Sequence, residues 1–560
     1  MTVVPPQSAK AVSKRWTPTR LLRVGMLTVA AIFFAAHFLH LNADFPNKSP
    51  WVDWAKYTDE GWYGDGAIRH YLTGHWYWEG DFNPAVALPM LPLVELIVFR
   101  FTGVSPVAAR AMTLCFFGLM VFVLYVLVER YTRPRRADSS VPLAAPLMVL
   151  FLCLSPFLYV FERMAIIEPL LILLMSLALL TASRLHPLHL PTREGGSWKA
   201  LFLAILPSTA LGILLPSMVL AKTTAVALFP AVGYLVWARS GYRFRRTVRM
   251  LLVPGALTVA IWLGYFLLFV RPHYLKDYQY LFAANAYTGI ELEPLATVVL
   301  NTLHDGLWMG VVLFPVFFFL LAVALFFRPH VFTNPLIPSL LLWVGGYFAF
   351  LMYHNNLQPR YYTIVAVPIT ALVALGLDQI REAGSRFATL MAGSVATVVA
   401  LAIAIPDAVQ QVEYIHNPTY DFFNAAQSIK QIVSADKAHP DLVLSISGSD
   451  LTLMTGMPSI DDDFGTDDLD VRVAKYHPGW YVAWNDIEDD KMDALRPLYQ
   501  PVRVASFPAM DDPDRDLLIL YRLDPRTTPA EVGKHPHRER TPKPLVTKIG
   551  QQPSTNQLEH

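Results

Sequence analysis

Two adjacent acids, Asp59 and Glu60, lie in a polar stretch near the start of the chain, between two apolar runs. Adjacent carboxylates point in different directions, so one can take a proton while the other binds an acceptor or a cation. Eight acids, four bases and many Trp and Tyr residues lie between positions 42 and 105. Such a surface suits a carbohydrate or a lipid-linked polar ligand. Taken singly, the acid pair is more commonly part of a solvated loop, and the aromatic residues more commonly form a belt at the lipid headgroups.

Further charged residues lie near or within apolar runs: Arg110, Arg163, Glu168, Lys222 and Arg360. An ionisable side chain at the bilayer centre costs about 2.5 to 3.5 kcal/mol on insertion scales, so such residues usually face a cavity, a partner or the interface. Arginine and lysine together suit a phosphate or diphosphate group, because arginine offers paired donors and lysine a compact charge. Each residue alone is more simply a snorkelling or ion-paired side chain, and Glu168 could neutralise Arg163.

The composition predicts a chain embedded in lipid. Of the 560 residues, 54% are apolar and 16% charged, and the mean hydropathy is +0.38, which argues against a soluble enzyme. The formal net charge of +1 leaves no broad basic field for nucleic acid, so no nucleic-acid partner is expected. Cys115 and Cys153 lie inside apolar runs, where a thiol acts as a small hydrophobic group, so neither a disulfide nor a zinc site is predicted.

Eleven segments are apolar enough to cross a bilayer, which needs about 20 residues per helix. They are 24–41, 107–128, 141–161, 164–183, 200–221, 223–238, 250–270, 306–327, 335–353, 361–378 and 387–406. A twelfth candidate, 86–99, is short, contains Glu95 and is interrupted by Pro89 and Pro92. We therefore expect it to lie on the membrane surface.

Charges in the short connections predict the orientation. Lysine and arginine are concentrated in the N-terminal segment 1–23 and in the connections after the spans that end at 128, 183 and 238. With eleven spans, all of these connections fall on the cytoplasmic side, as the positive-inside rule requires. We therefore expect an integral protein of the cytoplasmic membrane with a cytoplasmic N-terminus. The stretch 42–105 and everything after residue 406 would then lie on the periplasmic or extracytoplasmic side.

The chain changes character at residue 407, and 407–525 is predicted to be a small extracytoplasmic α/β domain. One helix and three short strands follow from the spacing of apolar residues: 421–434, 442–447, 479–484 and 517–523. The acidic run 461–470 lacks the spacing of a calcium loop, and we expect it to be solvated. Segment 526–560, rich in Pro, Lys, Arg and His, is predicted to be disordered.

Several motifs occur in an order that is typical of one superfamily. They are Asp59-Glu60 with Tyr63, then Asn83-Pro84 and Arg110, RMAIIEP at 163–169, AKTTAVALFP at 221–230 and QPRYYTIVAVP at 358–368. Over residues 20–380 this order resembles the GT-C superfamily of polytopic glycosyltransferases. The nearest branch contains the protein O-mannosyltransferases and lipid A aminoarabinose transferases, similar to glycosyltransferase family 39. The family often has His-Pro-Pro where this chain has Asn83-Pro84, and Asp where it has Glu168, which leaves the acceptor open.

The resemblance implies a GT-C fold of about eleven transmembrane helices, with 24–406 as the transmembrane domain and 42–105 as its outer catalytic loop. It implies transfer of a sugar from a polyprenyl-phosphate donor to an acceptor hydroxyl of a protein, lipid or glycan. Asp59 would be the base of a single, inverting displacement. Acids would orient the acceptor or sugar, tyrosines would hydrogen-bond the ligands, and cations would stabilise the leaving phosphate. The residues implied to bind substrate are Glu60, Tyr63, Arg110, Glu168, Lys222, Arg360 and Tyr361.

The sequence predicts no required cofactor and leaves two other functions open. The activated donor supplies the energy, so no cofactor is required, and the sequence contains no P-loop or dinucleotide fingerprint. A divalent cation beside the carboxylates stays open. One rival is a secondary transporter, which predicts charges near the bilayer midplane and paired broken helices. The other is a scaffold that binds the lipid carrier without turnover and is indifferent to the loss of Asp59.

Overall fold

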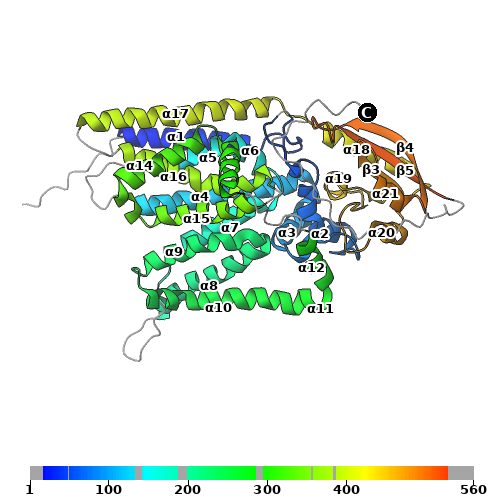
Figure 1. Cartoon of the computed structure of the whole chain (residues 1–560), viewed down its shortest axis with the longest axis horizontal. Helices are drawn as coiled ribbons and strands as arrows, with labels where there is room; N and C mark the ends of the chain where they lie inside the picture. Colours follow the sequence, from blue (N-terminus) through cyan, green and yellow to red (C-terminus); the bar gives the residue numbers. More distant parts are fainter. Residues whose placement is uncertain are drawn as a thin grey trace, which may run out of the picture.

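The structure is a computed structural model that describes residues 17–47, 49–132, 142–186, 198–284, 294–354, 357–381 and 386–526. A bundle of long helices is followed by a smaller α/β domain, which packs against one end of the bundle (Figure 1). We call this end the domain end. The segment predicted to be disordered, 526–560, lies outside the described residues except for Arg526.

Long apolar helices build the bundle. They are α1 (Pro18–Ala36), α4 (Pro106–Thr132), α5 (Ala144–Leu154), α6 (Pro156–Phe161), α7 (Ile167–Ala182), α8 (Trp198–Ala221), α9 (Phe229–Arg239), α10 (Phe244–Tyr265), α14 (Leu313–Phe327), α15 (Leu336–Tyr353), α16 (Thr363–Arg381) and α17 (Arg386–His416). Shorter segments join them: η3 (Thr223–Leu228), η4 (Phe266–Val270), α11 (Arg271–His273), α12 (Leu275–Ala284), α13 (Leu295–Asp305), η6 (Gly306–Met309), η7 (Pro329–Thr333) and η8 (Pro359–Tyr362). Proline explains one break: Pro156 cannot continue α5, and it begins α6 after the cap residue Ser155.

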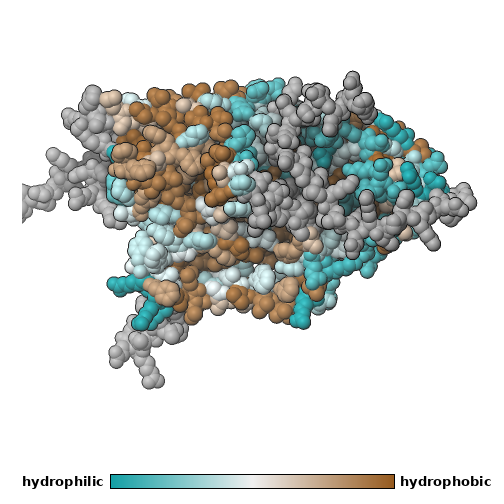
Figure 2. All heavy atoms as spheres, in the orientation of Figure 1, coloured by the Kyte–Doolittle hydropathy of each residue, from teal (hydrophilic) through white to brown (hydrophobic). Residues whose placement is uncertain are grey.

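Six of the described helical segments are long and apolar enough to cross a membrane, and a pair bent by 117°, Leu295–Met309 with Leu313–Phe327, makes a seventh. Shorter apolar helices lie among them, so the predicted number of eleven spans is not confirmed. Apolar side chains form a broad band over the bundle, and hydrophilic ones gather on the C-terminal domain (Figure 2). The predicted class, a polytopic helical membrane protein with a small C-terminal α/β domain, is confirmed.

Residues 42–105 fold as a cap on the domain end. Its first segment, η1 (Trp54–Lys56), begins after Asp53, whose carboxylate accepts the amide of Ala55 at 2.8 Å. Next, α2 (Asp59–Thr73) has two acids in its first turn, where the helix dipole favours negative charge, and ends at Gly74 with a φ of 81°. The cap ends with η2 (Pro84–Val86) and α3 (Met90–Thr102), whose 13 residues are too few to span a bilayer.

The C-terminal domain contains a five-stranded mixed sheet. Its strands are β1 (Val443–Leu444), β2 (Ser459–Ile460), β3 (Trp480–Trp484), β4 (Tyr499–Pro508) and β5 (Leu517–Pro525), in the order β2-β1-β3-β5-β4. Strand β1 is parallel to β2 and β3, and β5 is antiparallel to β3 and β4. The helices are α18 (Asp421–Ala435), α19 (Gly448–Thr455), α20 (Leu469–Tyr476) and α21 (Asp489–Leu495).

Two differences from the sequence-based expectations have local causes. The segment predicted as a strand over 442–447 pairs at two positions only among the described residues, because the chain turns at Ser445 and enters α19. Strand β4 was not predicted, since Pro501 and Pro508 interrupt its pattern. An edge strand tolerates proline, and β4 is an edge strand of the sheet.

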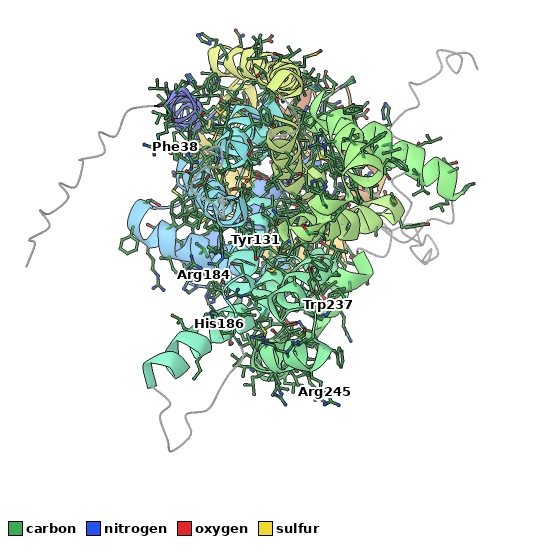
Figure 3. All side chains as sticks on the ribbon, turned by 90° about the vertical axis from the view of Figure 1, so that its left-hand side faces the viewer. Phe38, Tyr131, Arg184, His186, Trp237 and Arg245 are labelled. Atoms are coloured by element: carbon green, nitrogen blue, oxygen red, sulfur yellow. The ribbon has the colours of Figure 1, made fainter. Side chains whose placement is uncertain are left out.

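Arg184 and Arg245 lie at the end of the bundle opposite to the C-terminal domain, which we call the arginine end (Figure 3). There Arg130 donates to the carbonyl of Ser183 at 3.1 Å, and Arg239 donates to the carbonyl of Leu185 at 3.4 Å. These bonds satisfy carbonyls at the C-terminal end of α7, where positive charge also suits the helix dipole. The described arginines Arg130, Arg184 and Arg239 therefore lie at one end of the bundle, as the predicted orientation requires. The orientation itself stays a prediction.

Candidate active site

Asp59 lies where the cap meets the bundle, at the first residue of α2, and is 1% exposed. One carboxylate oxygen accepts the hydroxyl of Thr58 at 2.7 Å, and the other lies 2.6 Å from a guanidinium nitrogen of Arg360. The Arg360 side chain also pairs with Asp53, and its backbone amide donates to the second oxygen of Asp53 at 3.0 Å. Backbone and side chain thus fix Arg360 just before α16.

A second ion pair lies beside the first. Lys222, between α8 and η3, pairs with Glu168 in the first turn of α7. The ring of Tyr361 joins the two pairs, because its centroid lies 4.0 Å from Lys222 Nζ and 4.9 Å from Arg360 Cζ. Tyr63 lies one turn after Asp59 on α2, and its hydroxyl interacts electrostatically with Asp59, Arg360 and Glu168. We call the group the Asp59 cluster: Asp53, Asp59, Tyr63, Glu168, Lys222, Arg360 and Tyr361.

Burial is the largest influence on the pKa values of Asp59 and Tyr63, the two cluster residues on α2. Burial raises the pKa of Asp59 above its ordinary value, Arg360 opposes the shift, and Asp53 adds to it. Burial likewise raises the pKa of the Tyr63 hydroxyl. A carboxylate with a raised pKa is a stronger base than an ordinary one. Three carboxylates and two cations therefore meet in one buried cluster.

Glu60 and Arg110 do not join the cluster. They form a two-point ion pair with each other, in which Arg110 Nε donates to Glu60 Oε1 at 2.8 Å. The amide of Ala165 donates to the same oxygen at 2.8 Å, and Arg110 also donates to the carbonyls of Leu41, at 2.7 Å, and Ala43. The pair therefore ties α2 to α4, to the end of the first span and to the α6–α7 connection.

Sequence reasoning missed two acids beside these groups. Asp53 was counted among the acids of the polar stretch, and no local signal links it to Arg360. Glu162 caps α6, is buried, and has no hydrogen-bond partner for either oxygen among the described residues. The possible neutralisation of Arg163 by Glu168 is not observed, because Glu168 pairs with Lys222.

The C-terminal domain packs directly on α2. The amide of Gly61 donates to Asp450 at 3.1 Å, and the hydroxyl of Ser449 donates to Asp65 at 2.9 Å. A Cβ atom at Gly61 would lie 2.1 Å from the carbonyl carbon of Ser449, so the close approach requires glycine. The start of α2, with Asp59, is therefore held between the bundle and the C-terminal domain.

The acidic run 461–470 differs from its expected solvated state. Asp461 and Asp462 are 6% and 4% exposed. The indole of Trp62 donates to Asp461 at 3.0 Å, and the hydroxyl of Tyr481 donates to Asp462 at 2.7 Å. The expectation is wrong for these two acids, because contacts with the cap and the sheet bury them. Within the described ranges, no group of three or more His, Cys, Asp or Glu side chains is placed to hold a metal ion.

Comparisons with known proteins identify the fold. No family model matches the sequence, and no curated protein matches it. The structure is similar to that of ArnT from Cupriavidus metallidurans bound to undecaprenyl phosphate, with a TM-score of 0.56, 15% identity and coverage of 90% of this chain and 98% of that chain. The chain has the GT-C glycosyltransferase fold.

Two further solved structures were compared with the chain. ArnT in the apo state gives a TM-score of 0.56 at 13% identity, over 90% of this chain and 98% of that chain. The oligosaccharyltransferase of Archaeoglobus fulgidus gives a TM-score of 0.47 at 11% identity, over 88% of this chain and 76% of that chain. The likeness to the two ArnT structures confirms the resemblance stated from the motifs at the level of the fold.

Proposed function

We propose that this chain is a membrane glycosyltransferase that moves a sugar from a polyprenyl-phosphate-linked donor to an acceptor hydroxyl at the domain end of the bundle. The Asp59 cluster carries the proposal, because it gathers a buried carboxylate with a raised pKa, two cations and two tyrosines at one place in a GT-C fold. The similar ArnT structure contains undecaprenyl phosphate, which supports a polyprenyl phosphate as the carrier.

The proposed reaction is a single displacement. Asp59 takes the proton of the acceptor hydroxyl while the oxygen of that hydroxyl attacks the anomeric carbon of the sugar. The bond from the anomeric carbon to the phosphate oxygen breaks, and the configuration at that carbon inverts. The polyprenyl phosphate leaves with the bonding electrons, and Lys222 and Arg360 stabilise its charge. Asp53 supports this role, because it orients the guanidinium of Arg360 before the donor binds.

The remaining predicted residues divide into ligand contacts and positioning residues. The second carboxylate oxygen of Glu168 is buried and has no hydrogen-bond partner among the described residues, so a sugar hydroxyl would satisfy it. Tyr63 and Tyr361 would hydrogen-bond the ligands. Glu60 and Arg110 are assigned as positioning residues, because their side chains already bond to protein groups.

We further propose that the domain end faces the periplasm or the outside of the cytoplasmic membrane. The described arginines Arg130, Arg184 and Arg245 lie together at the opposite end, which the positive-inside rule assigns to the cytoplasm. Acceptor hydroxyls of proteins, lipids or glycans would reach the Asp59 cluster from the side of the C-terminal domain.

The test offers purified protein in lipid a panel of polyprenyl-phosphate sugars together with a crude membrane fraction as the acceptor. Sugar transfer from one member of the panel would support the proposal and name the donor. Ion-coupled flux through proteoliposomes without transfer would instead identify a secondary transporter. Binding of the carrier without turnover from any donor would identify a scaffold.

A further inference from the structure

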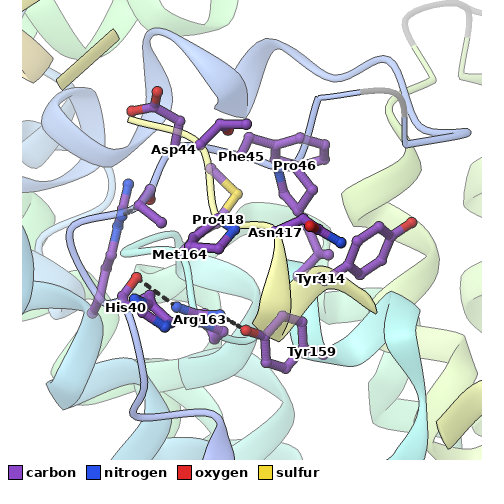
Figure 4. Close-up of a pocket in the computed structure, with 14 residues that line it drawn as sticks. His40, Asp44, Phe45, Pro46, Tyr159, Arg163, Met164, Tyr414, Asn417 and Pro418 are labelled. Atoms are coloured by element: carbon purple, nitrogen blue, oxygen red, sulfur yellow. Dashed lines mark hydrogen bonds between the residues drawn. The ribbon is translucent and has the colours of Figure 1, made fainter. Parts of the chain in front are cut away.

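A pocket lies at the domain end, apart from the Asp59 cluster (Figure 4). Three segments form it: 40–46 after α1, 159–164 at the α6–α7 connection, and 414–419, where the chain leaves α17 and enters the C-terminal domain. We call it the hinge pocket. Its polar and aromatic lining includes His40, Phe45, Tyr159, Arg163, Tyr414 and Asn417. Arg110 also lines it, with Glu60 as its ion-pair partner, and no member of the Asp59 cluster is among the lining residues.

Arg163 brings a positive charge to this pocket without an acidic partner. Its guanidinium donates to the hydroxyl of Tyr159 and to the carbonyls of Leu39 and His40, at 2.7 and 2.8 Å for the two carbonyls. All three acceptors are neutral, and none of the ion pairs among the described residues includes Arg163. Burial lowers the pKa of Arg163 below its ordinary value. A desolvated cation is stabilised when an anion pairs with it.

Asp44, the acid that lines the hinge pocket, bonds to the backbone of the C-terminal domain and not to Arg163. Asp44 accepts the backbone amides of Phe422 and Phe423, at 2.9 and 3.1 Å, at the start of α18. Burial raises the pKa of Asp44 to about 7, so much of this acid is neutral at neutral pH. The charge of Arg163 is therefore free to attract an external anion.

The hinge pocket lies where two lipid-facing helices end. Only 6% of the apolar window of α1 and 11% of that of segment Met391–Ala435, which begins in α17, is buried inside the protein, so both leave an apolar surface exposed. Segment 40–46 follows the end of α1 closely, and Asn417 directly follows α17. A lipid whose acyl chains lie along these helices would carry its head group to the level of the pocket. There the guanidinium of Arg163 could pair with the phosphate of the head group.

We propose that the hinge pocket binds the phosphate of an anionic lipid head group, with Arg163 as its main contact and the acyl chains along α1 and α17. This site is separate from the donor site, and the inference does not depend on sugar transfer. An occupied pocket would also stabilise the docking of the C-terminal domain, because the same segment joins α17 to α18 and Asp44 binds the start of α18.

The test titrates phosphatidylglycerol into the purified full-length protein in detergent and counts bound lipids by native mass spectrometry, with zwitterionic phosphatidylcholine as the comparison lipid. Arg163→Gln should weaken phosphatidylglycerol binding roughly tenfold or more, because hydrogen bonds to a charged group are strong. Asn417→Trp should weaken it too, since the ring fills the pocket from an exposed position and leaves Arg163 in place. Arg100→Gln, at an exposed arginine of α3, is the matched control.

Each outcome decides the proposal. Weaker phosphatidylglycerol binding in both pocket variants, with normal binding in Arg100→Gln, supports a lipid as the source of the phosphate. Arg163-dependent binding of glycerol 1-phosphate without lipid binding supports the phosphate chemistry and assigns a soluble source. Equal binding by the wild type and both pocket variants, or equal affinity for the two lipids, overturns the proposal. The readout is independent of the transfer assay, so failure of the glycosyltransferase proposal is recognised separately.

Discussion

Replacing Arg110 by Gln should destabilise the fold and leave donor binding intact. Glu60 and Arg110 are 3% and 6% exposed, so their ion pair is shielded from water. Without the guanidinium, Glu60 keeps the amide of Ala165 as its partner, and the carbonyls of Leu41 and Ala43 lose their donor. Breaking a buried ion pair from one side costs about 3 to 5 kcal/mol of folding free energy, because a buried charge is left unpaired.

The free energy of unfolding is measured by denaturant titration in detergent for Arg110→Gln, Glu60→Gln and the double variant. The double variant leaves no unpaired charge at this pair, so its loss should be smaller than the sum of the two single losses. Arg100→Gln, at an exposed site, should change the unfolding free energy by less than about 0.5 kcal/mol. Unchanged unfolding of Arg110→Gln together with lost donor binding would refute the positioning role and restore the ligand contact predicted from the sequence.

Three further predictions follow from the cap and the orientation. Gly61→Ala should loosen the C-terminal domain, because its Cβ atom would meet the Ser449 backbone, whereas Gly25→Ala, in open space, should not; limited proteolysis distinguishes them, and equal protection of both variants would contradict the docking. Because burial raises the pKa of Asp59 and a base must be ionised, transfer should rise with pH through a pKa above the ordinary value of about 3.9. Asp53→Asn should shift the rising part of the pH–rate profile to lower pH, because Asp53 raises the pKa of Asp59. An unshifted profile would count against Asp59 as the base. In a variant without Cys115, an impermeant thiol reagent added outside the cell should label a cysteine at Val471 and spare one at Thr132, and the opposite pattern would reverse the orientation.

The two cations of the Asp59 cluster could be predicted from the sequence because their charge conflicts with their surroundings. Lys222 and Arg360 lie beside apolar runs, where a charge needs a polar partner. The partners themselves could not be predicted. Arg360 pairs with Asp53, 307 positions earlier, and Lys222 pairs with Glu168, 54 positions earlier, so both pairings depend on how the helices pack. The Glu60–Arg110 pair could not be predicted for the same reason, so Arg110 was predicted to contact the ligand.

Hydropathy could predict the class of the fold, whereas the number of spans and the burial of acidic residues depend on how the segments bend and pack. Helices α5 and α6 share one predicted span that is broken at Ser155, and the pair around α13 and α14 is bent by 117°. Apolar length alone therefore does not determine the number of spans. The acidic run shows a second limit, since composition favours solvent for Asp461 whereas its contact with Trp62 buries it. Contacts between distant segments decide burial, and local composition does not contain them.

The most direct test of the central claim is single-turnover sugar transfer by the wild type, Asp59→Asn and Glu79→Gln, with donor binding measured on the same samples. Glu79 lies in the same cap, and its side chain is 88% exposed, so Glu79→Gln controls for the loss of one acid. We predict that Asp59→Asn still binds the donor and transfers sugar about 100-fold more slowly or worse, as expected for loss of a general base. Glu79→Gln should transfer sugar like the wild type. Transfer by Asp59→Asn at the wild-type rate would contradict the account.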